Sequence, residues 1–183
     1  MHPSRARANL LDAVAALTRA GVRPFLVDGT LLGAVREHGF IGHDLDIDLG
    51  LFIEDLRPGI VPALVAAGFT AHKTYGAPAR GLQFSFKRHQ IKLDLFCYYL
   101  DPVRHERFHA AWLGEQPIRY GYPTFDLAPL LFLGATFLAP ADPVAFLVTK
   151  YGPDWRVPVT PWDWAWGPKN ATEWIEAIAE VLA

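Results

Sequence analysis

Apolar residues recur along this chain with two periods, one helical and one strand-like, and the two alternate along its length. Spacings of three and four residues are typical of amphipathic helices, whereas alternation in steps of two is typical of half-buried strands. Helices are predicted over Arg5–Ala20, Leu31–His38, Pro58–Ala67, Asp142–Lys150 and Ala171–Leu182. Strands are predicted over Pro24–Val27, His43–Phe52, Gly81–Arg88 and Ile91–Leu100, the last two as a hairpin. This order predicts an α/β or α+β fold with a mixed sheet.

The end of the chain has a different character. Residues 152–168 are rich in proline and tryptophan, which favours an ordered loop over a linker. Asn170 and Glu173 match a capping box, which predicts the start of the last helix. The 183 residues suffice for one domain with a full core. We therefore expect a single domain over 1–183, with a catalytic core at about 24–100 and a closing helical and Trp-rich segment at about 130–183.

Three aspartates alternate with apolar residues in the predicted strand His43–Phe52. Side chains along a strand point to opposite faces in turn, so Asp44, Asp46 and Asp48 share one face. Leu45 falls on the other face, which is expected to pack on the core. Alternate residues lie about 6.6–6.8 Å apart, so neighbouring carboxylates could converge on one metal ion or bridge a pair. The alternative is a solvent-exposed face of an edge strand, but like charges among apolar residues favour a cation, and Mg²⁺ fits best.

A further carboxylate stands in the predicted strand Ile91–Leu100. Lys92 and Asp94 share one face of this strand, opposite its apolar residues. A charge inside an apolar strand is costly without a partner. Asp94 is therefore expected either to complete the metal site with Asp46 and Asp48 or to form a structural salt bridge, and the first strand favours the metal.

A tight turn at Asp28, Gly29 and Thr30 joins a predicted strand to a helix. The free N–H groups and positive dipole end of a helix N-terminus suit a phosphate. Gly29 would let the backbone approach the phosphate closely, and Thr30 could donate its hydroxyl. The alternative is a simple helix cap. Arg36, near the end of that helix, is either a phosphate clamp or a surface arginine.

Composition narrows the class of protein. Hydrophobic residues make up 51% and charged residues 20%, with 17 basic against 19 acidic residues, so the chain is globular and no nucleic-acid partner is expected. The apolar run after Arg5 is interrupted by Asp12 and Arg19, which favours an amphipathic helix over a signal peptide, and no membrane span is expected. Cys97 is the single cysteine and is expected to be buried. A cytoplasmic location is expected.

The segments Gly29–Arg36, Gly39–Ile41 and Asp44–Leu49 resemble the core of the LicD and fukutin-related family. That family belongs to the nucleotidyltransferase-fold superfamily, together with enzymes similar to DNA polymerase beta. Further matches to its closing segment are Phe137–Pro140, Asp142–Pro143, Tyr151–Trp155 and Pro158. The similarity covers about residues 24–158, with a weaker match at about 101–130.

The resemblance implies a nucleotidyltransferase fold with a mixed β-sheet flanked by helices. It also implies transfer of a phospho-alcohol group, such as phosphocholine or ribitol phosphate, from a CDP-linked donor to a hydroxyl of a sugar or small molecule. Two Mg²⁺ (or Mn²⁺) ions would be held by Asp46, Asp48 and Asp94, and Asp94 or Asp44 would take the acceptor's proton. On the donor-phosphate side the resemblance implies Gly29, Thr30 and Arg36.

The chain also departs from the family pattern. His43 stands where tryptophan is frequent, Leu45 where another acid is frequent, and Asp28 where a small residue is common. We expect the chain to lack the membrane anchor and the companion domain of the fukutin-related proteins, so a small soluble acceptor is expected as readily as a glycan. Two other functions stay open, namely nucleotidyl transfer from an NTP to a small molecule and a catalytically idle binding protein. The sequence leaves the oligomeric state open.

Several other residues are candidates for substrate contact. Their own contexts favour structural roles for some of them, such as a strand cap for His43 and a packed lid for the Trp155–Trp166 segment, with a stacking wall as the functional alternative. The spacing of His105 and His109 predicts exposed residues on a short helix, or a metal pair if functional. The candidates for substrate binding are His43, Lys92, Lys150, Tyr151 and Trp155.

Overall fold

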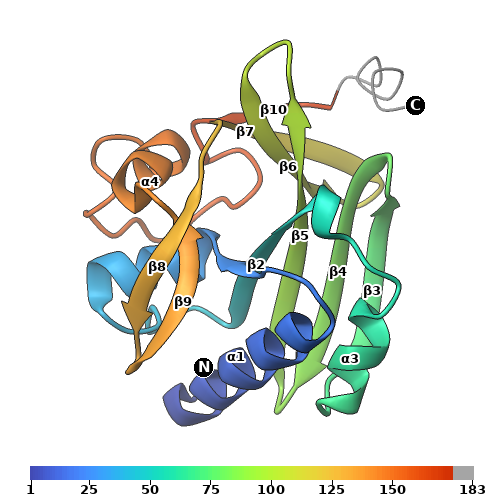
Figure 1. The fold of residues 1–183 in the computed structure, drawn as a ribbon. Coiled ribbons are helices and arrows are strands. Elements are labelled where there is room, and N and C mark those ends of the chain that lie inside the picture. Colours follow the sequence, from blue (N-terminus) through green and yellow to red (C-terminus); the bar gives the residue numbers. More distant parts are fainter. Residues whose placement is uncertain (175–183) are drawn as a thin grey trace.

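The fold is a mixed sheet with helices packed around it, and the computed structural model describes residues 1–174 (Figure 1). The helical elements are α1 (Pro3–Arg19), α2 (Asp28–Leu32), the π-helical turn η1 (Gly33–Glu37), the 3-10 turn η2 (Ile53–Asp55), α3 (Ile60–Ala66) and α4 (Pro143–Tyr151). The strands are β1 (Phe25–Leu26), β2 (Asp46–Phe52), β3 (Thr70–Ala77), β4 (Arg80–Arg88), β5 (Ile91–Asp101), β6 (Glu106–Leu113), β7 (Gln116–Pro123), β8 (Leu127–Phe132), β9 (Ala135–Pro140) and β10 (Ala171–Glu173).

The described strands follow the order β10-β7-β6-β5-β2-β1-β9-β8, with β4 paired to β5 and β3 paired to β4. Most pairs are antiparallel, but β2 runs parallel to β5 and β1 runs parallel to β9. The β2–β5 register places Asp46 opposite Lys92 and Asp48 opposite Asp94. The two strands predicted to carry functional acids are therefore direct neighbours, and the predicted α/β class with a mixed sheet is confirmed.

Local sequence explains several boundaries. Pro3 opens α1, where a missing N–H costs nothing, and Pro143 opens α4 in the same way. The Asp142 carboxylate caps α4 by accepting the Ala145 N–H at 2.9 Å, and Gly152 ends the helix with φ of 87°. The helices predicted in these regions and the β4–β5 hairpin are confirmed to within a few residues.

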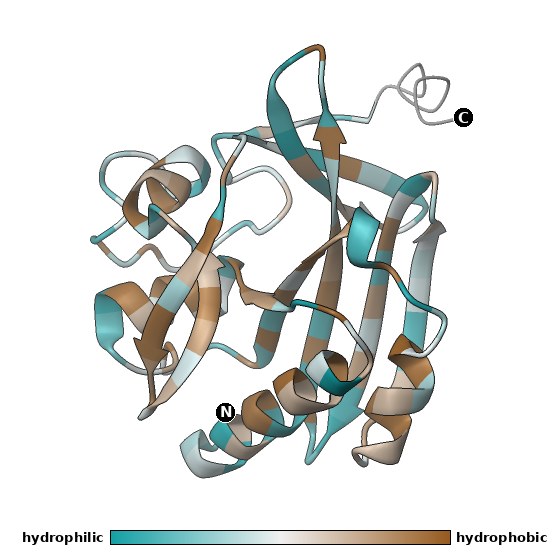
Figure 2. Ribbon diagram, in the orientation of Figure 1, coloured by the Kyte–Doolittle hydropathy of each residue, from teal (hydrophilic) through white to brown (hydrophobic). Residues whose placement is uncertain are grey.

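The core lies between the sheet and the helices. Along β4, hydrophobic and hydrophilic residues alternate in bands (Figure 2), and both faces of its middle are buried, since Gln83 and Ser85 are covered as well as Leu82 and Phe86. Helix α1 crosses in front of β4 and β5 (Figure 1), and its Asn9 donates to the Arg88 carbonyl at 2.9 Å. Gly50 lets β2 approach this core closely, because a Cβ there would lie 2.5 Å from the Phe25 ring. Cys97 is fully buried as predicted.

The predicted strand over residues 43–52 is wrong at its N-terminal end. Strand β2 begins at Asp46, and Leu45 is 71% exposed instead of packing on the core. Asp44 Oδ1 accepts the Leu45 N–H at 3.0 Å, so this backbone N–H bonds to a neighbouring side chain and not to another strand. Asp44 therefore reaches the site from a loop and not from the strand itself.

Residues 101–140 also differ from expectation. His105 and His109 do not share a helix, because His105 lies in a turn with φ of 53° and His109 is a buried residue of β6. Strands β6 to β9 occupy the stretch that the sequence left without elements, and the closing segment thus begins with strands. The predicted helix Ala171–Leu182 is wrong at its start, because Ala171–Glu173 pairs with β7 as β10. The remainder of that predicted helix, residues 175–182, lies outside the described residues.

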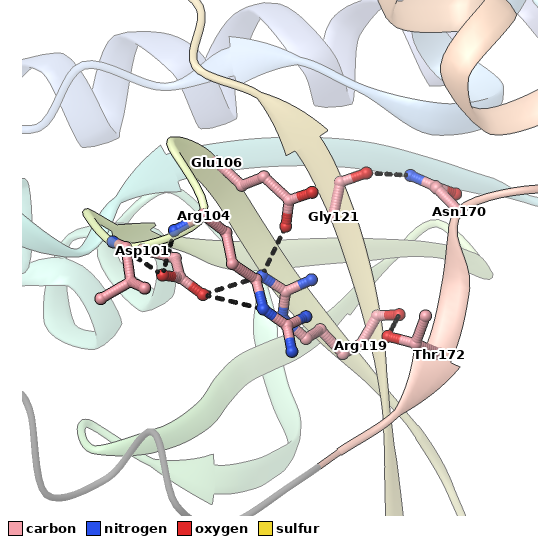
Figure 3. Close-up of polar contacts among 8 residues, drawn as sticks. Asp101, Arg104, Glu106, Arg119, Gly121, Asn170 and Thr172 are labelled. Carbon is pink, nitrogen blue, oxygen red and sulfur yellow. Dashed lines mark hydrogen bonds and ion pairs between the residues drawn. The ribbon is translucent and has the colours of Figure 1, made fainter.

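A polar network fixes the far end of the sheet. Figure 3 shows the buried Arg119 guanidinium beside the carboxylates of Asp101 and Glu106, at 3.4 and 2.8 Å. Nearby, Asn170 Nδ2 donates to the Gly121 carbonyl at 2.8 Å, which ties the chain before β10 to β7. The network holds β5, β6 and β7 together and anchors the exit of the Trp-rich loop. Within residues 1–174, no helix is long and apolar enough to cross a membrane.

Candidate active site

Three carboxylates converge at the start of β2. One oxygen from each of Asp44, Asp46 and Asp48 lies within 4.8 Å of the other two. Asp48 is buried, whereas Asp44 and Asp46 are partly exposed, so the cluster opens toward solvent on one side. Closely spaced carboxylate oxygens are the donors that hard divalent cations prefer, and this set fits Mg²⁺ or Mn²⁺. The expected set differs in one member, because Asp44 and not Asp94 completes this group of three.

The electrostatics of the cluster reflect crowding of like charge. Burial, together with the neighbouring Asp46, raises the pKa of Asp44 to about 7. Burial raises the pKa of Asp48 well above its ordinary value, and the charges of Asp46, Asp28 and Asp44 add to the effect. Such carboxylates are costly to ionise together unless a cation is present. A cation bound among these carboxylates would therefore relieve their mutual repulsion.

The turn at the start of α2 supports the cluster directly. Gly29 donates its backbone N–H to Asp48 Oδ2 at 3.0 Å, and the Asp48 N–H donates to Thr30 Oγ1 at 2.9 Å. A Cβ on Gly29 would collide with Asp44 Oδ2 and lie 3.1 Å from Asp48 Oδ2. The glycine is thus required for close approach of the turn to the carboxylates. Thr30 is buried, and its hydroxyl oxygen is engaged inside the protein.

Asp94 lies beside the cluster and is bridged to it by a lysine. The Lys92 ammonium lies 2.9 Å from Asp94 Oδ2 and 3.0 Å from Asp46 Oδ2. Burial raises the pKa of Asp94, although Lys92 opposes the shift. Burial alone would lower the pKa of Lys92, but Asp94 and Asp46 outweigh it and raise that pKa above its ordinary value. The two residues predicted on one face of β5 therefore both reach the acidic site.

A buried ion pair stands behind the turn. Lys150 Nζ lies 2.5 Å from Asp28 Oδ1, and both side chains are almost fully buried. His109 Nε2 lies 3.9 Å from Asp28 Oδ2, and its ring stacks on Tyr120 with centroids 5.1 Å apart. Burial lowers the pKa of His109 to about 4, so the ring is neutral at pH 7. Lys150 is predicted to contact substrate, but in the structure it is buried and paired with Asp28, the turn residue that departs from the family pattern.

Helix α4 and the loop after it close one side of the site. Arg36 Nη1 donates to the Trp155 carbonyl at 3.2 Å, and its Nε lies 2.8 Å from Glu37 Oε1. The Trp155 ring is buried, so it packs within the protein. Burial raises the pKa of Tyr151 well above its ordinary value, with further contributions from Asp28 and Asp48. Tyr151 therefore sits within electrostatic reach of the carboxylates.

The Trp-rich loop, residues 152–168, is anchored at several points. The Lys169 N–H donates to the Lys150 carbonyl at 2.7 Å, which brings the two ends of the loop together. Tyr120 Oη donates to the carbonyls of Trp164 and Ala165 at 3.1 and 3.0 Å. The Trp164 and Trp166 side chains are about half exposed, so the packed-lid interpretation holds for Trp155 and not for these two. His43, the remaining candidate, is exposed beside the cluster.

Two of the residues around the site were not predicted for it. The sequence predicts Asp28 only as a residue of the turn that departs from the family pattern, and it predicts His109 as an exposed residue of a short helix. Asp28 could have been recognised because it stands next to Gly29 in an apolar stretch of the sequence. A carboxylate that is buried there needs a positively charged partner. His109 alternates with apolar residues in Glu106–Leu113, and that alternation indicates a strand.

The pairing of β2 with β5, both of which carry aspartates, and the glycine turn at the start of α2 form an arrangement typical of the nucleotidyltransferase fold. A solved structure of the antibiotic-resistance factor ANT(2'')-Ia has a similar fold, with a TM-score of 0.53 and 17% identity over 88% of this chain and 77% of that one. The family model described as LicD/FKTN/FKRP, nucleotidyltransferase domain, matches residues 21–142. The chain belongs to this LicD/FKTN/FKRP family.

The relatives include characterised transferases. The chain is 32% identical to the mouse ribitol-5-phosphate transferase FKTN, over 95% of this chain and 40% of that protein. It is 34% identical to the human ribitol 5-phosphate transferase FKRP, over 76% of this chain and 30% of that protein. The chain thus spans less than half the length of these relatives.

Proposed function

We propose that this chain is a metal-dependent transferase that moves a phospho-alcohol group from a CDP-linked donor to a hydroxyl of a sugar or small molecule. The observation that carries the proposal is the convergence of Asp44, Asp46 and Asp48 beside Asp94 in the register of β2 and β5. Membership of a family that includes ribitol-phosphate transferases supports the donor class.

Asp44, Asp46 and Asp48 are proposed to hold Mg²⁺ or Mn²⁺. When bound, the cation neutralises charge on the phosphate oxygens of the donor and acidifies a hydroxyl close to it. The Gly29 N–H fixes Asp48 Oδ2, so this ligand is oriented before the cation arrives. The Asp28–Thr30 turn, which the sequence predicts to bind the donor phosphate, therefore also holds a proposed metal ligand in place.

The remaining groups would position the reactants. Lys92 supplies positive charge directly at the cluster, and Arg36, which holds the Trp155 carbonyl, is proposed to act on the donor phosphate. The half-exposed tryptophans of the loop would offer surface to an acceptor or base. Asp94 is proposed to accept the proton of the acceptor hydroxyl at a carboxylate oxygen, because its pKa is raised by burial. Catalysis would then consist of positioning and charge neutralisation, as in other phosphoryl transfers.

The first experiment tests the donor class. Melting temperatures would be measured with Mg²⁺ and CDP-ribitol, CDP-choline, CTP, ATP or GTP, and products would be analysed by mass spectrometry. We expect stabilisation by a CDP-linked alcohol, with about 2.7 kcal/mol gained at a hundred times the dissociation constant, and release of CMP. Stabilisation by ATP or GTP alone, with release of pyrophosphate, would replace the proposal by nucleotidyl transfer.

Two controls identify the site that is responsible. Asp48→Asn should abolish the ligand-dependent shift, because it removes a charged ligand while keeping the shape of the side chain. Asp142→Asn is the matched control, since asparagine also caps a helix and Asp142 caps α4 away from the cluster. A protein that folds, binds none of these nucleotides and releases neither product would instead be a binding protein.

A further inference from the structure

We propose that the Lys92 ammonium is the built-in second cation of the site, so that the carboxylates bind a single divalent ion, at Asp44, Asp46 and Asp48. The inference rests on the metal-dependent transfer proposed above and goes further by fixing the number of ions. It replaces the pair of divalent ions expected from the sequence by one ion and one side chain.

The position of Lys92 follows from the sheet. Because β2 and β5 are parallel and in register, Lys92 stands opposite Asp46, and Asp94 stands two residues further along β5. From there Nζ reaches Asp46 Oδ2 at 3.0 Å and Asp94 Oδ2 at 2.9 Å. Both distances are those of charge-assisted contacts. The ammonium thus lies between the two acids that a second divalent ion would have to bridge.

The carboxylates themselves separate into two groups. The oxygens of Asp44, Asp46 and Asp48 converge on one point, and Asp94 is not among the residues that converge. Asp94 Oδ2 instead contacts the Lys92 ammonium at 2.9 Å. Lys92 contacts one oxygen of each of these acids and leaves Asp94 Oδ1 without a hydrogen-bond partner among residues 1–174. An ion placed between Asp46 and Asp94 would nevertheless lie close to the ammonium and would be repelled by it at short range.

An ammonium group suits the role of a resident cation. It carries three N–H donors, and Asp46 and Asp94 engage two of them. The Lys92 side chain is 40% exposed, so the third donor is accessible from solvent. We assign this donor to a phosphate oxygen of the nucleotide-linked substrate. Lys92 would then neutralise the charge of the phosphate on the side opposite the divalent ion. Unlike a second metal ion, the lysine does not have to bind from solution.

The first test counts ions. Mn²⁺ would be titrated into the metal-free protein by calorimetry, alone and with saturating CDP, whose diphosphate is the group that a second ion would bind. We expect one Mn²⁺ per chain in both titrations and the electron paramagnetic resonance spectrum of an isolated ion. Two ions per chain with an exchange-coupled spectrum would overturn the inference and leave the proposed transfer intact. Absence of any Mn²⁺ binding would overturn the metal-dependent function itself.

The second test moves the charge. Lys92→Gln should tighten the binding of the first Mn²⁺ by at least about tenfold, because it removes a positive charge beside the ligand Asp46. Lys92→Arg keeps the charge and should keep the affinity of the unaltered protein. Lys87→Gln is the matched control, because Lys87 is an exposed lysine directly opposite Lys92 on β4. Unchanged affinity in a folded Lys92→Gln protein would mean that the lysine leaves when the ion binds, and the inference would fail.

Discussion

The Lys150 ammonium lies 2.5 Å from the Asp28 carboxylate and joins the end of α4 to the first residue of α2. Asp28 precedes Gly29, whose N–H holds Asp48, so the buried pair stands directly behind the carboxylate cluster. Although burial alone would raise the pKa of Asp28, the charge of Lys150 outweighs it and the pKa is lowered. The Asp28 carboxylate is therefore charged, and neither member of the pair is easily removed alone.

Lys150→Met should destabilise the protein by about 3–5 kcal/mol, because it leaves the Asp28 charge buried without its partner. Adding Asp28→Asn should restore a large part of this loss, since the unpaired charge disappears. Urea denaturation of the two single variants and the double variant measures the coupling. Equal destabilisation in Lys150→Met and in the double variant would contradict a buried charge pair.

Asp46→Asn and Asp48→Asn should each weaken Mn²⁺ binding by more than about tenfold and abolish turnover, because each removes a charged ligand. The metal-free variants should be more stable than the unaltered protein, since like-charge repulsion in the cluster falls. Calorimetry and urea denaturation give the two quantities, with Asp142→Asn as control. Unchanged affinity in both variants would show that the metal site lies elsewhere.

Gly29→Ala should lower Mn²⁺ affinity and turnover by about tenfold to a hundredfold. The added Cβ would collide with Asp44 Oδ2 and press on Asp48, so the carboxylate oxygens could not keep their spacing. Gly42→Ala makes the same change where a Cβ would meet no atom within 4 Å, and it should behave as the unaltered protein. Equal effects of the two substitutions would rule out close approach as the reason for Gly29.

His109 should give the protein a pH-dependent stability of its own. Its pKa lies at about 4 in the folded state, below the ordinary 6.5, so the unfolded chain binds more protons between these values. The contribution to stability is complete above pH 6.5 and is lost as the pH falls, by about 3 kcal/mol at pH 4. His109→Phe should flatten this part of the curve, whereas His72→Phe, at an exposed site on β3, should not.

Cys97→Ala should leave turnover nearly unchanged and cost about 0.5–3 kcal/mol of stability through lost packing. The thiol is fully buried, and burial raises its pKa to about 12, so native protein should resist thiol reagents. Reaction with a chromogenic disulfide, followed with and without denaturant, checks this. Rapid inactivation by such a reagent without unfolding would contradict the structural role.

The shared face of Asp46 and Asp48 could be predicted from the sequence because alternation is a local property of a strand. The expected packing of Leu45 failed because the strand begins at Asp46, three residues later than predicted, and the Asp44 side chain satisfies the Leu45 N–H before it. The neighbouring positions of Asp48 and Asp94 follow from a parallel pairing between distant segments, to which no short-range pattern points directly.

The Asp28–Lys150 pair and the burial of His109 could not be predicted from local patterns either, because both depend on contacts between segments that are distant in the sequence. Lys150 and Asp28 are brought together by the packing of α4 against α2, and His109 is buried only when β6 pairs with β5 and β7. The spacing of His105 and His109 fits one helical turn equally well, and Gly114, with φ of 65°, instead turns β6 back into a hairpin. The pairing of β6 with its neighbouring strands therefore decided between the helical and the strand period, both of which the sequence allowed here.

The meeting of the two ends of the Trp-rich loop at the Lys169–Lys150 backbone bond divides the chain into a fixed and an exchangeable part. The segment between these two residues starts and ends at the same place, so its length imposes little on the strands that carry the carboxylates, although Trp155 and Ala165 within it are part of the core. Other sequences could be grafted in place of the exposed stretch around Trp164 and Trp166, with Trp155 retained, which would remodel the surface proposed to meet the acceptor while the carboxylates of β2 and β5 are preserved. Acceptor choice and phosphate chemistry would thus be separable by protein engineering.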